Sequence, residues 1–155
     1  MKRYILVVII LVLVLIPKGA EFYTVASAFN CNDYCFYVEG EVDEADFTRV
    51  IKNGDGYVGY CPLIDAPDIK KEYGGSVSGE SFTVSGTKVT VGEIIRELSG
   101  RVVSEGTVDG IYTVYIYTGK LNTPSVELFD DKVNVQIALN GDRVTVGYPI
   151  ILGSY

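Results

Sequence analysis

The chain contains no histidine, and this absence limits the chemistry that its side chains could perform. A serine or cysteine nucleophile needs a base beside it, so a lysine or a carboxylate would have to replace the imidazole. Residues 75–79 hold two glycines at the spacing of a nucleophile elbow, but Val77 occupies the position that the serine would need. We therefore predict no nucleophilic hydrolase and assign no catalytic residue.

Paired carboxylates are the remaining catalytic option, because two acids flanking a sugar ring can hydrolyse a glycosidic bond. Glu39 and Glu41 share one face of a predicted strand, and Asp130 and Asp131 are adjacent at a predicted turn. A chain with 20 Asp and Glu residues forms such pairs by chance, so a solvated acidic surface is the simpler interpretation. A glycan hydrolase is kept as the alternative, and it requires two carboxyl groups about 5–10 Å apart in one cleft.

Tyrosine supplies the main binding chemistry of the chain, which contains 12 Tyr and no Trp. The alternation of a strand places Tyr115 and Tyr117 on one face and Tyr112 on the other. Exposed rings in a row suit a sugar, a glycan or a protein partner, because each offers apolar area and a hydroxyl group. The competing interpretation is that both tyrosines are half-buried sheet residues with good strand propensity.

Three cysteines leave several structural interpretations open. A disulfide between Cys35 and Cys61 would join the first predicted strand to a later segment, and one between Cys31 and Cys35 would close only the lead-in. Free buried thiols are the third interpretation. No cofactor is predicted, and no metal site either, because three cysteines without histidine do not form a zinc set.

The first 28 residues have the order of a secretory signal: a basic start, an apolar run and a small-residue cleavage motif. Lys2 and Arg3 are basic, residues 4–16 are uninterrupted apolar residues, and Ala-Ser-Ala stands at 26–28. We predict export by this segment, followed by a domain at 29–155. Retention as an N-terminal membrane anchor and a buried core helix are the alternatives.

The charge balance argues against a nucleic-acid partner. The chain has 13 Lys and Arg against 20 Asp and Glu, a formal net charge of −7. The densest basic point, Lys70 with Lys71, is flanked by Asp68 and Glu72. An acidic surface repels phosphate backbones, so the expected partners are a protein or a glycan, and membrane contact is expected only through residues 4–16 if they remain attached.

Tyr115 and Tyr117 are positioned by a predicted block of strands at the end of the chain, at 111–118, 132–139 and 143–151. The last two are joined by Asn-Gly-Asp. Asn-Gly between alternating apolar runs predicts a hairpin with a type I′ turn.

The first half is predicted to hold a strand at 34–42 and then a helix capped by Asp43 and ended at Asn53, with apolar residues at i, i+3 and i+4. A strand at 57–63 and an irregular linker at 64–75 follow.

The middle is predicted to hold a hairpin of 81–84 with 88–91, then a helix capped by Thr90 and ended by Gly100, then a strand at 101–107. This order of elements predicts an α+β fold: a curved antiparallel sheet with two helices packed on one face.

The sequences Val-Asn-Val-Gln-Ile-Ala-Leu at 133–139 and Val-Thr-Val-Gly-Tyr-Pro-Ile-Ile at 144–151 are similar to the closing pattern of the YwmB-like family. These are exported proteins of Gram-positive, mostly spore-forming bacteria, and the resemblance covers roughly residues 91–155. It implies a fold like that of TATA-box-binding protein and a role in the cell envelope, with a protein or cell-wall glycan as partner. DNA binding does not follow from such a fold.

Overall fold

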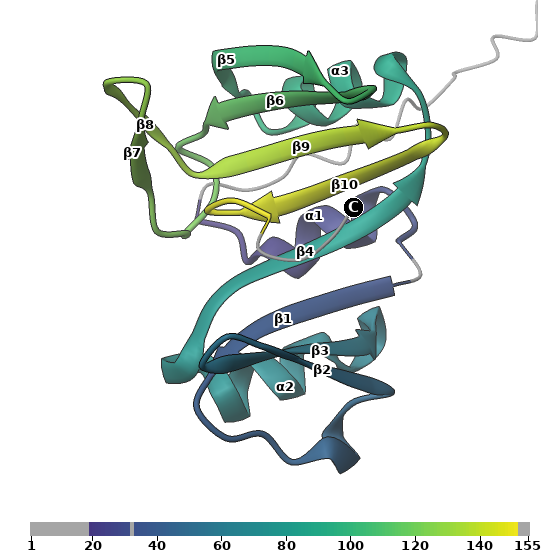
Figure 1. Cartoon of the computed structure of the whole chain (residues 1–155), viewed down its shortest axis with the longest axis vertical. Helices are drawn as coiled ribbons and strands as arrows, with labels where there is room; N and C mark the ends of the chain where they lie inside the picture. Colours follow the sequence, from purple (N-terminus) through teal and green to yellow (C-terminus); the bar gives the residue numbers. More distant parts are fainter. Residues whose placement is uncertain (1–18, 32, 152–155) are drawn as a thin grey trace, which may run out of the picture.

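The chain folds around one eight-stranded antiparallel sheet, shown in the computed structural model of Figure 1. The structure describes residues 19–31 and 33–151. Each neighbouring pair of strands is antiparallel and the sheet is not closed, so the predicted α+β class with a large antiparallel sheet is confirmed. The strands lie in the order β2 (Arg49–Asn53), β3 (Gly56–Pro62), β1 (Asp33–Glu39), β4 (Val77–Ser85), β10 (Arg143–Tyr148), β9 (Val135–Asn140), β6 (Ile111–Tyr117) and β5 (Arg101–Val108).

A separate two-stranded hairpin, β7 (Val126–Leu128) with β8 (Asp131–Val133), projects from the loop between β6 and β9 (Figure 1). The Arg101 guanidinium of β5 donates two hydrogen bonds to the Asp131 carboxylate, at 2.6 and 2.9 Å. This bidentate ion pair joins the small hairpin to the edge of the large sheet.

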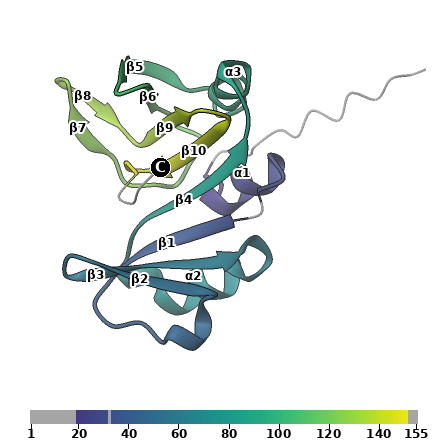
Figure 2. The same ribbon diagram turned by 45° about the vertical axis from the view of Figure 1, so that its right-hand side comes forward.

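Within residues 19–151, where residue 32 is not described, three α-helices cover one face of the sheet, whereas two were predicted (Figure 2). They are α1 (Phe22–Ala28), α2 (Ala66–Tyr73) and α3 (Lys88–Glu97). All three contribute buried side chains to the main apolar core, together with sheet residues such as Phe36 and Phe82. No helix in the described part of the chain is long and apolar enough to cross a membrane.

α1 lies in the segment that was predicted to contain the signal cleavage site, and it is part of the core. Phe22 is 1% exposed, and Val25 and Ala26 are fully buried. The described fold therefore includes residues that a domain boundary between 28 and 29 would remove. The basic start and the apolar run at 4–16 lie outside the described residues.

The backbone just before α1 is also tied to the domain. The amides of Gly19 and Ala20 both donate to the carbonyl of Lys120, at 2.7 and 3.0 Å, and Ala20 forms an isolated parallel bridge with Leu121. This stretch is therefore held by hydrogen bonds as well as by packing.

The predicted hairpin near the end of the chain is confirmed as β9 and β10, but its turn differs from the prediction. Asn140 pairs with Arg143, so the two loop residues are Gly141 and Asp142. Gly141 has a φ of 62° and Asp142 does not have a positive φ, which is the pattern of a type II′ turn. The type I′ pattern occurs instead between β5 and β6, where Asp109 and Gly110 have φ values of 50° and 80°.

The predicted helix capped by Asp43 is wrong. Its cap exists, because the Asp43 carboxylate accepts from the Ala45 amide at 2.9 Å, but only the 3-10 turn Glu44–Asp46 follows. The chain then enters β2, which pairs with β3. Apolar residues at 47, 50 and 51 satisfy the helical spacing, yet pairing with β3 determines the local structure, and Ile51 is 46% exposed.

Two further predictions in the first half are wrong. The segment predicted as a linker at 64–75 contains the helix α2. Pro67 lies in the first turn of this helix, and Ile69 is one of its buried residues. The expected hairpin at 81–91 is instead one long strand, β4, followed directly by α3. The predicted second helix is confirmed as α3, but Thr87 is its N-cap and Thr90 completes the capping box.

Candidate functional site

The face of the sheet opposite the helices is the part of the molecule best suited to binding. Strand alternation sends most of the large apolar residues toward the helices and places tyrosines, arginines and short polar side chains on this open face. Across the middle of the sheet, Cys35 of β1 stands between Tyr60 of β3 and Ser81 of β4. Cys35, Tyr37 and Val58 form a second, smaller buried cluster there, with Tyr60 packed against it.

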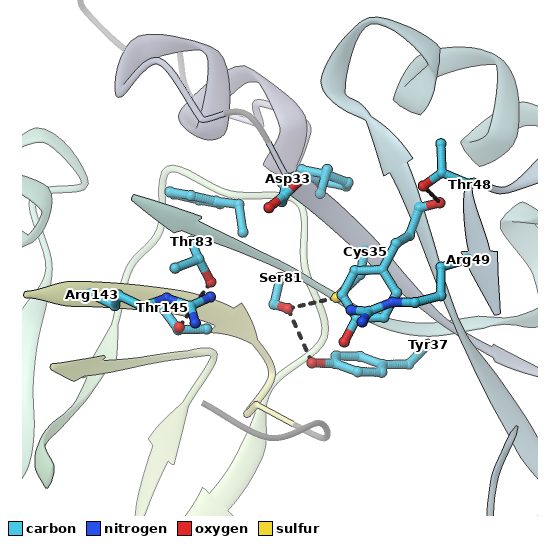
Figure 3. A pocket seen from close by; sticks show the side chains of 12 residues that line it. Asp33, Cys35, Tyr37, Thr48, Arg49, Ser81, Thr83, Arg143 and Thr145 are labelled. Carbon is cyan, nitrogen blue, oxygen red and sulfur yellow. Dashed lines mark hydrogen bonds between the residues drawn. The ribbon is translucent and has the colours of Figure 1, made fainter. Parts of the chain in front are cut away.

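A hollow of about 470 Å³ lies on this open face, over β2, β3, β1, β4 and β10 (Figure 3). Its size falls in the range of small-molecule sites in proteins. Most of the side chains that enter it can form hydrogen bonds, and they include Tyr37, Arg49, Tyr60, Ser81, Thr83 and Arg143.

A chain of hydrogen bonds organises the floor of the hollow. The Ser81 hydroxyl lies 2.9 Å from the Cys35 sulfur and 3.1 Å from the Tyr37 hydroxyl. Beside it, the hydroxyls of Thr83 and Thr145 are 2.9 Å apart across β4 and β10. These groups are fixed by strand pairing and by each other, so the floor is preorganised.

Two arginines reach into the hollow from opposite sides, with Ser81 between them in Figure 3. The Arg49 guanidinium lies over the ring of Tyr60, 4.0 Å from its centroid. Among the described residues, neither Arg49 nor Arg143 forms an ion pair with a carboxylate. Asp33 is the acidic side chain that lines the hollow.

A second hollow of about 470 Å³ adjoins the first and shares Asp33, Thr83 and Arg143 with it. It extends toward Phe29 and Asn30, at the loop that leads from α1 into β1. Because the two hollows share three lining residues, they lie side by side, and a ligand larger than a single small ion could contact both.

The predicted binding tyrosines lie on this same open face, on β6. Tyr115 and Tyr117 are half-buried, and Tyr112 points to the helix side, where it packs against the main core. Phe129, at the tip of the β7–β8 hairpin, contacts Tyr115 edge-on with 5.4 Å between ring centroids. Phe129 is 62% exposed and has a φ of 54°, which is unusual for a bulky side chain. Tyr115, Tyr117 and Phe129 are called the aromatic patch below.

The structure does not bring the two predicted disulfide partners together. Cys35 and Cys61 are both free and buried. Cys61 is opposite Tyr34 in the β1–β3 pairing, one position out of phase with Cys35, so the two side chains point to opposite faces of the sheet. Cys31 is also a buried free thiol, as the third interpretation of the sequence allowed.

The predicted carboxylate pairs do not have the environment of a catalytic acid. Glu39 and Glu41 are exposed, and so is Asp130. The Arg101 guanidinium lowers the pKa of Asp131 to about 2. Among the described residues, no group of three or more Cys, Asp and Glu could hold a metal ion.

The one buried carboxylate described lies on the covered side of the sheet. Glu80 is fully buried. It forms an ion pair with Lys70, whose Nζ lies 3.0 Å from Glu80 Oε2, and it accepts a hydrogen bond from the Tyr148 hydroxyl. Burial raises the pKa of Glu80, and the hydrogen bond from Tyr148 and the charge of Lys70 oppose this shift. Among the residues that the structure describes, Glu80 Oε1 and the nearby Tyr34 hydroxyl have no hydrogen-bond partner of good geometry.

Sequence reasoning singled out Tyr115 and Tyr117, and it missed the hollow. Arg49, Ser81 and Arg143 come from β2, β4 and β10, which meet only through the strand order of the sheet. No local motif links them. Comparisons with protein-family models, with curated proteins and with solved structures gave no match to this chain.

Proposed function

We propose that this protein is a non-enzymatic binding module of the cell envelope that uses the open face of its sheet to hold a wall glycan. The observation that carries the proposal is the polar hollow, with a second hollow beside it, on a sheet face that the described helices leave free. Fixed hydroxyls, guanidinium groups and tyrosine rings in one depression are the groups that recognise sugars.

The chemistry of the hollow favours binding over catalysis. Burial raises the pKa of the Cys35 thiol, and the hydrogen bonds from Ser81 and Tyr37 only partly offset this. Such a thiol is a poor nucleophile, since the thiolate is the reactive form. Glycoside hydrolysis by the general mechanism needs two carboxyl groups in one cleft, whereas Asp33 is the single acid that lines this hollow.

The aromatic patch extends the proposed binding surface toward the β5 edge of the sheet. Tyr115 and Tyr117 would contact the same glycan chain, with Phe129 held beside them by the strained turn of its hairpin. Strained backbone is maintained where the surrounding structure requires it, often at binding sites.

The resemblance of residues 91–155 to the YwmB-like family supports an exported protein of the envelope. An antiparallel sheet with helices on a single face agrees with a curved, TATA-box-binding-protein-like fold, which we propose for this chain. The net charge of −7 of the whole chain argues against a nucleic acid, a long polyanion, as its partner.

A pull-down on isolated cell-wall sacculi tests this proposal. The full-length chain is expected to sediment with sacculi and to release no sugar fragments into the supernatant. Tyr115→Ala is expected to weaken retention, and Tyr112→Ala is the matched control, because Tyr112 points to the other face of the same strand. Released fragments would establish the hydrolase alternative, and no retention of the wild-type chain would refute the binding proposal.

A further inference from the structure

We infer that the hollow selects an anionic saccharide and holds its carboxylate or phosphate between Arg49 and Arg143. This inference rests on the proposed glycan-binding function and adds the charge class of the ligand. The two guanidinium groups reach into the same depression from β2 and β10, on either side of the hydroxyl-lined floor (Figure 3).

Arg49 is prepared for bidentate recognition of an oxyanion. Its guanidinium is held over the ring of Tyr60, its neighbour across the β2–β3 pairing, at 4.0 Å. Stacking on the ring fixes the plane of the group and leaves the N–H edges available, and a guanidinium edge matches the two oxygens of a carboxylate or phosphate. A lysine at this position would lack that geometry.

Arg143 supplies the second positive charge among the side chains that line the hollow. In the described part of the chain, neither arginine forms an ion pair, although the chain has more acids than bases. The charged side chains that line the hollow are Arg49, Arg143 and Asp33, so the site carries a net positive charge on an acidic protein. A concave surface of one sign concentrates ligands of the opposite sign.

The neutral groups of the hollow match the remainder of a sugar. The hydroxyls of Ser81, Thr83 and Thr145 lie on the floor and can exchange hydrogen bonds with ring substituents. Asp33 is an acceptor at the junction of the two hollows, where a sugar hydroxyl or acetamido N–H can donate to it. A free inorganic anion would use only the arginines.

A comparison of three amino sugars distinguishes recognition of the negative charge from recognition of the sugar ring. N-acetylglucosamine is neutral, N-acetylmuramic acid adds a carboxylate, and N-acetylglucosamine 6-phosphate adds a phosphate. Titration calorimetry with the full-length chain is expected to show that at least one anionic sugar binds about ten- to a hundredfold more tightly than the neutral one. The tighter of the two anionic sugars identifies the oxyanion. Inorganic phosphate at the same ionic strength is expected to bind more weakly than either.

Variants of the two arginines test their assignment. Arg49→Gln and Arg143→Gln are each expected to remove most of the preference for the anionic sugar, and Arg49→Lys is expected to keep only part of it. Arg96→Gln is the control, because Arg96 is an exposed residue of α3 on the covered side of the sheet. Urea unfolding of each variant distinguishes lost binding from lost folding.

Equal affinity for all three sugars, or an unchanged preference in folded Arg49→Gln and Arg143→Gln, would overturn the inference. Retention on sacculi without any preference for an anionic sugar would leave the binding function intact and refute only the charge assignment. Failure to bind both sacculi and sugars would refute the proposed function together with the inference.

Discussion

The ring of Phe22 packs edge-on against the ring of Tyr148, with 4.9 Å between their centroids. The first helix described is thereby joined to the last strand. Phe22 also contacts Tyr34 and Phe82, at centroid distances of 6.2 and 5.4 Å, so one α1 side chain touches three strands of the sheet. α1 therefore packs on one face of the sheet, and the hollow lies on the opposite face.

Replacement of Phe22 by alanine should destabilise the whole domain. A fully buried phenylalanine leaves a cavity among three rings, and such changes cost about 3–5 kcal/mol of unfolding free energy. Ser27→Ala on the exposed side of the same helix should change it by less than about 0.5 kcal/mol. Urea unfolding measures both, and a Phe22→Ala variant as stable as Ser27→Ala would show that α1 is not part of the core.

The packing of α1 also predicts where an exported chain can begin. Cleavage after Ala28 would remove Phe22, Val25 and Ala26 from the core, so the processed chain should begin at or before Gly19 or keep its N-terminal segment. Intact-mass analysis of the exported protein determines the position. A folded, exported chain that begins at Phe29 would contradict this prediction.

The buried Glu80 should make stability depend on pH. Burial raises its pKa, so the folded state binds this proton more tightly than the unfolded state. Stability from this group is therefore present at low pH and is lost as the pH rises through the folded pKa. The groups that face it are Lys70, Tyr148, Tyr34 and Glu21, and the comparison with Glu80→Gln removes their common contribution.

The difference in unfolding free energy between wild type and Glu80→Gln isolates this effect. It should shift in favour of the glutamine variant as the pH increases above about 4.5, the ordinary carboxyl pKa. Parallel pH profiles for the two proteins would mean that the Glu80 pKa is not raised. Tyr148→Phe should cost about 1–3 kcal/mol, because it removes a hydrogen bond to a buried carboxylate.

Phe129 should matter for binding much more than for stability. Its φ of 54° costs about 1–2 kcal/mol for a residue with a side chain, and glycine removes that cost. The lost contact with Tyr115 is worth a similar amount, so the unfolding free energy of Phe129→Gly should lie within about 1 kcal/mol of the wild-type value. Retention on sacculi should nevertheless fall. Val108→Ala changes another highly exposed apolar residue, 73% exposed against 62% for Phe129, that lies outside the patch, and it should leave retention unchanged.

The three cysteines should resist alkylation in the folded protein. Burial raises the pKa of Cys31 to about 11 and that of Cys61 to about 12, and it also raises the pKa of Cys35. Few thiolates are therefore present at pH 8, and the sulfurs are shielded. Iodoacetamide followed by mass spectrometry should modify all three only in urea. Rapid modification without urea would contradict the structure, and so would a mass lower by two hydrogen atoms, which marks a disulfide.

Elements with strong local signals were predictable from the sequence. The hairpin of β9 and β10 follows from alternating apolar runs around a short turn, and α3 follows from its apolar stripe, although its predicted cap, Thr90, is three residues past the true N-cap, Thr87. β2 and α2 were not predictable in this way. The residues of β2 fit either element, and their partner β3 decided the outcome, whereas burial of Ile69 against the core stabilises a helix where composition indicated a linker.

The residues of the candidate site also fall into those that a local pattern predicts and those that depend on the strand order. Tyr115 and Tyr117 could be found because two positions in one strand share a face whatever the topology. Arg49 and Arg143 could not, because 94 positions separate them in the sequence and only the order β2-β3-β1-β4-β10 makes them line one hollow. Strand order depends on which apolar surfaces bury one another, and no short sequence pattern records it.

Fluorine NMR of the chain labelled with 3-fluorotyrosine tests most directly whether the open face binds glycan. Tyrosines lie on both faces of the sheet, and each resonance can be assigned from a Tyr→Phe variant. Soluble wall-glycan fragments should shift the resonances of Tyr37, Tyr60, Tyr115 and Tyr117 and leave those of Tyr34 and Tyr148 unchanged. Shifts confined to the helix side, or no shifts in a chain that still sediments with sacculi, would contradict the account.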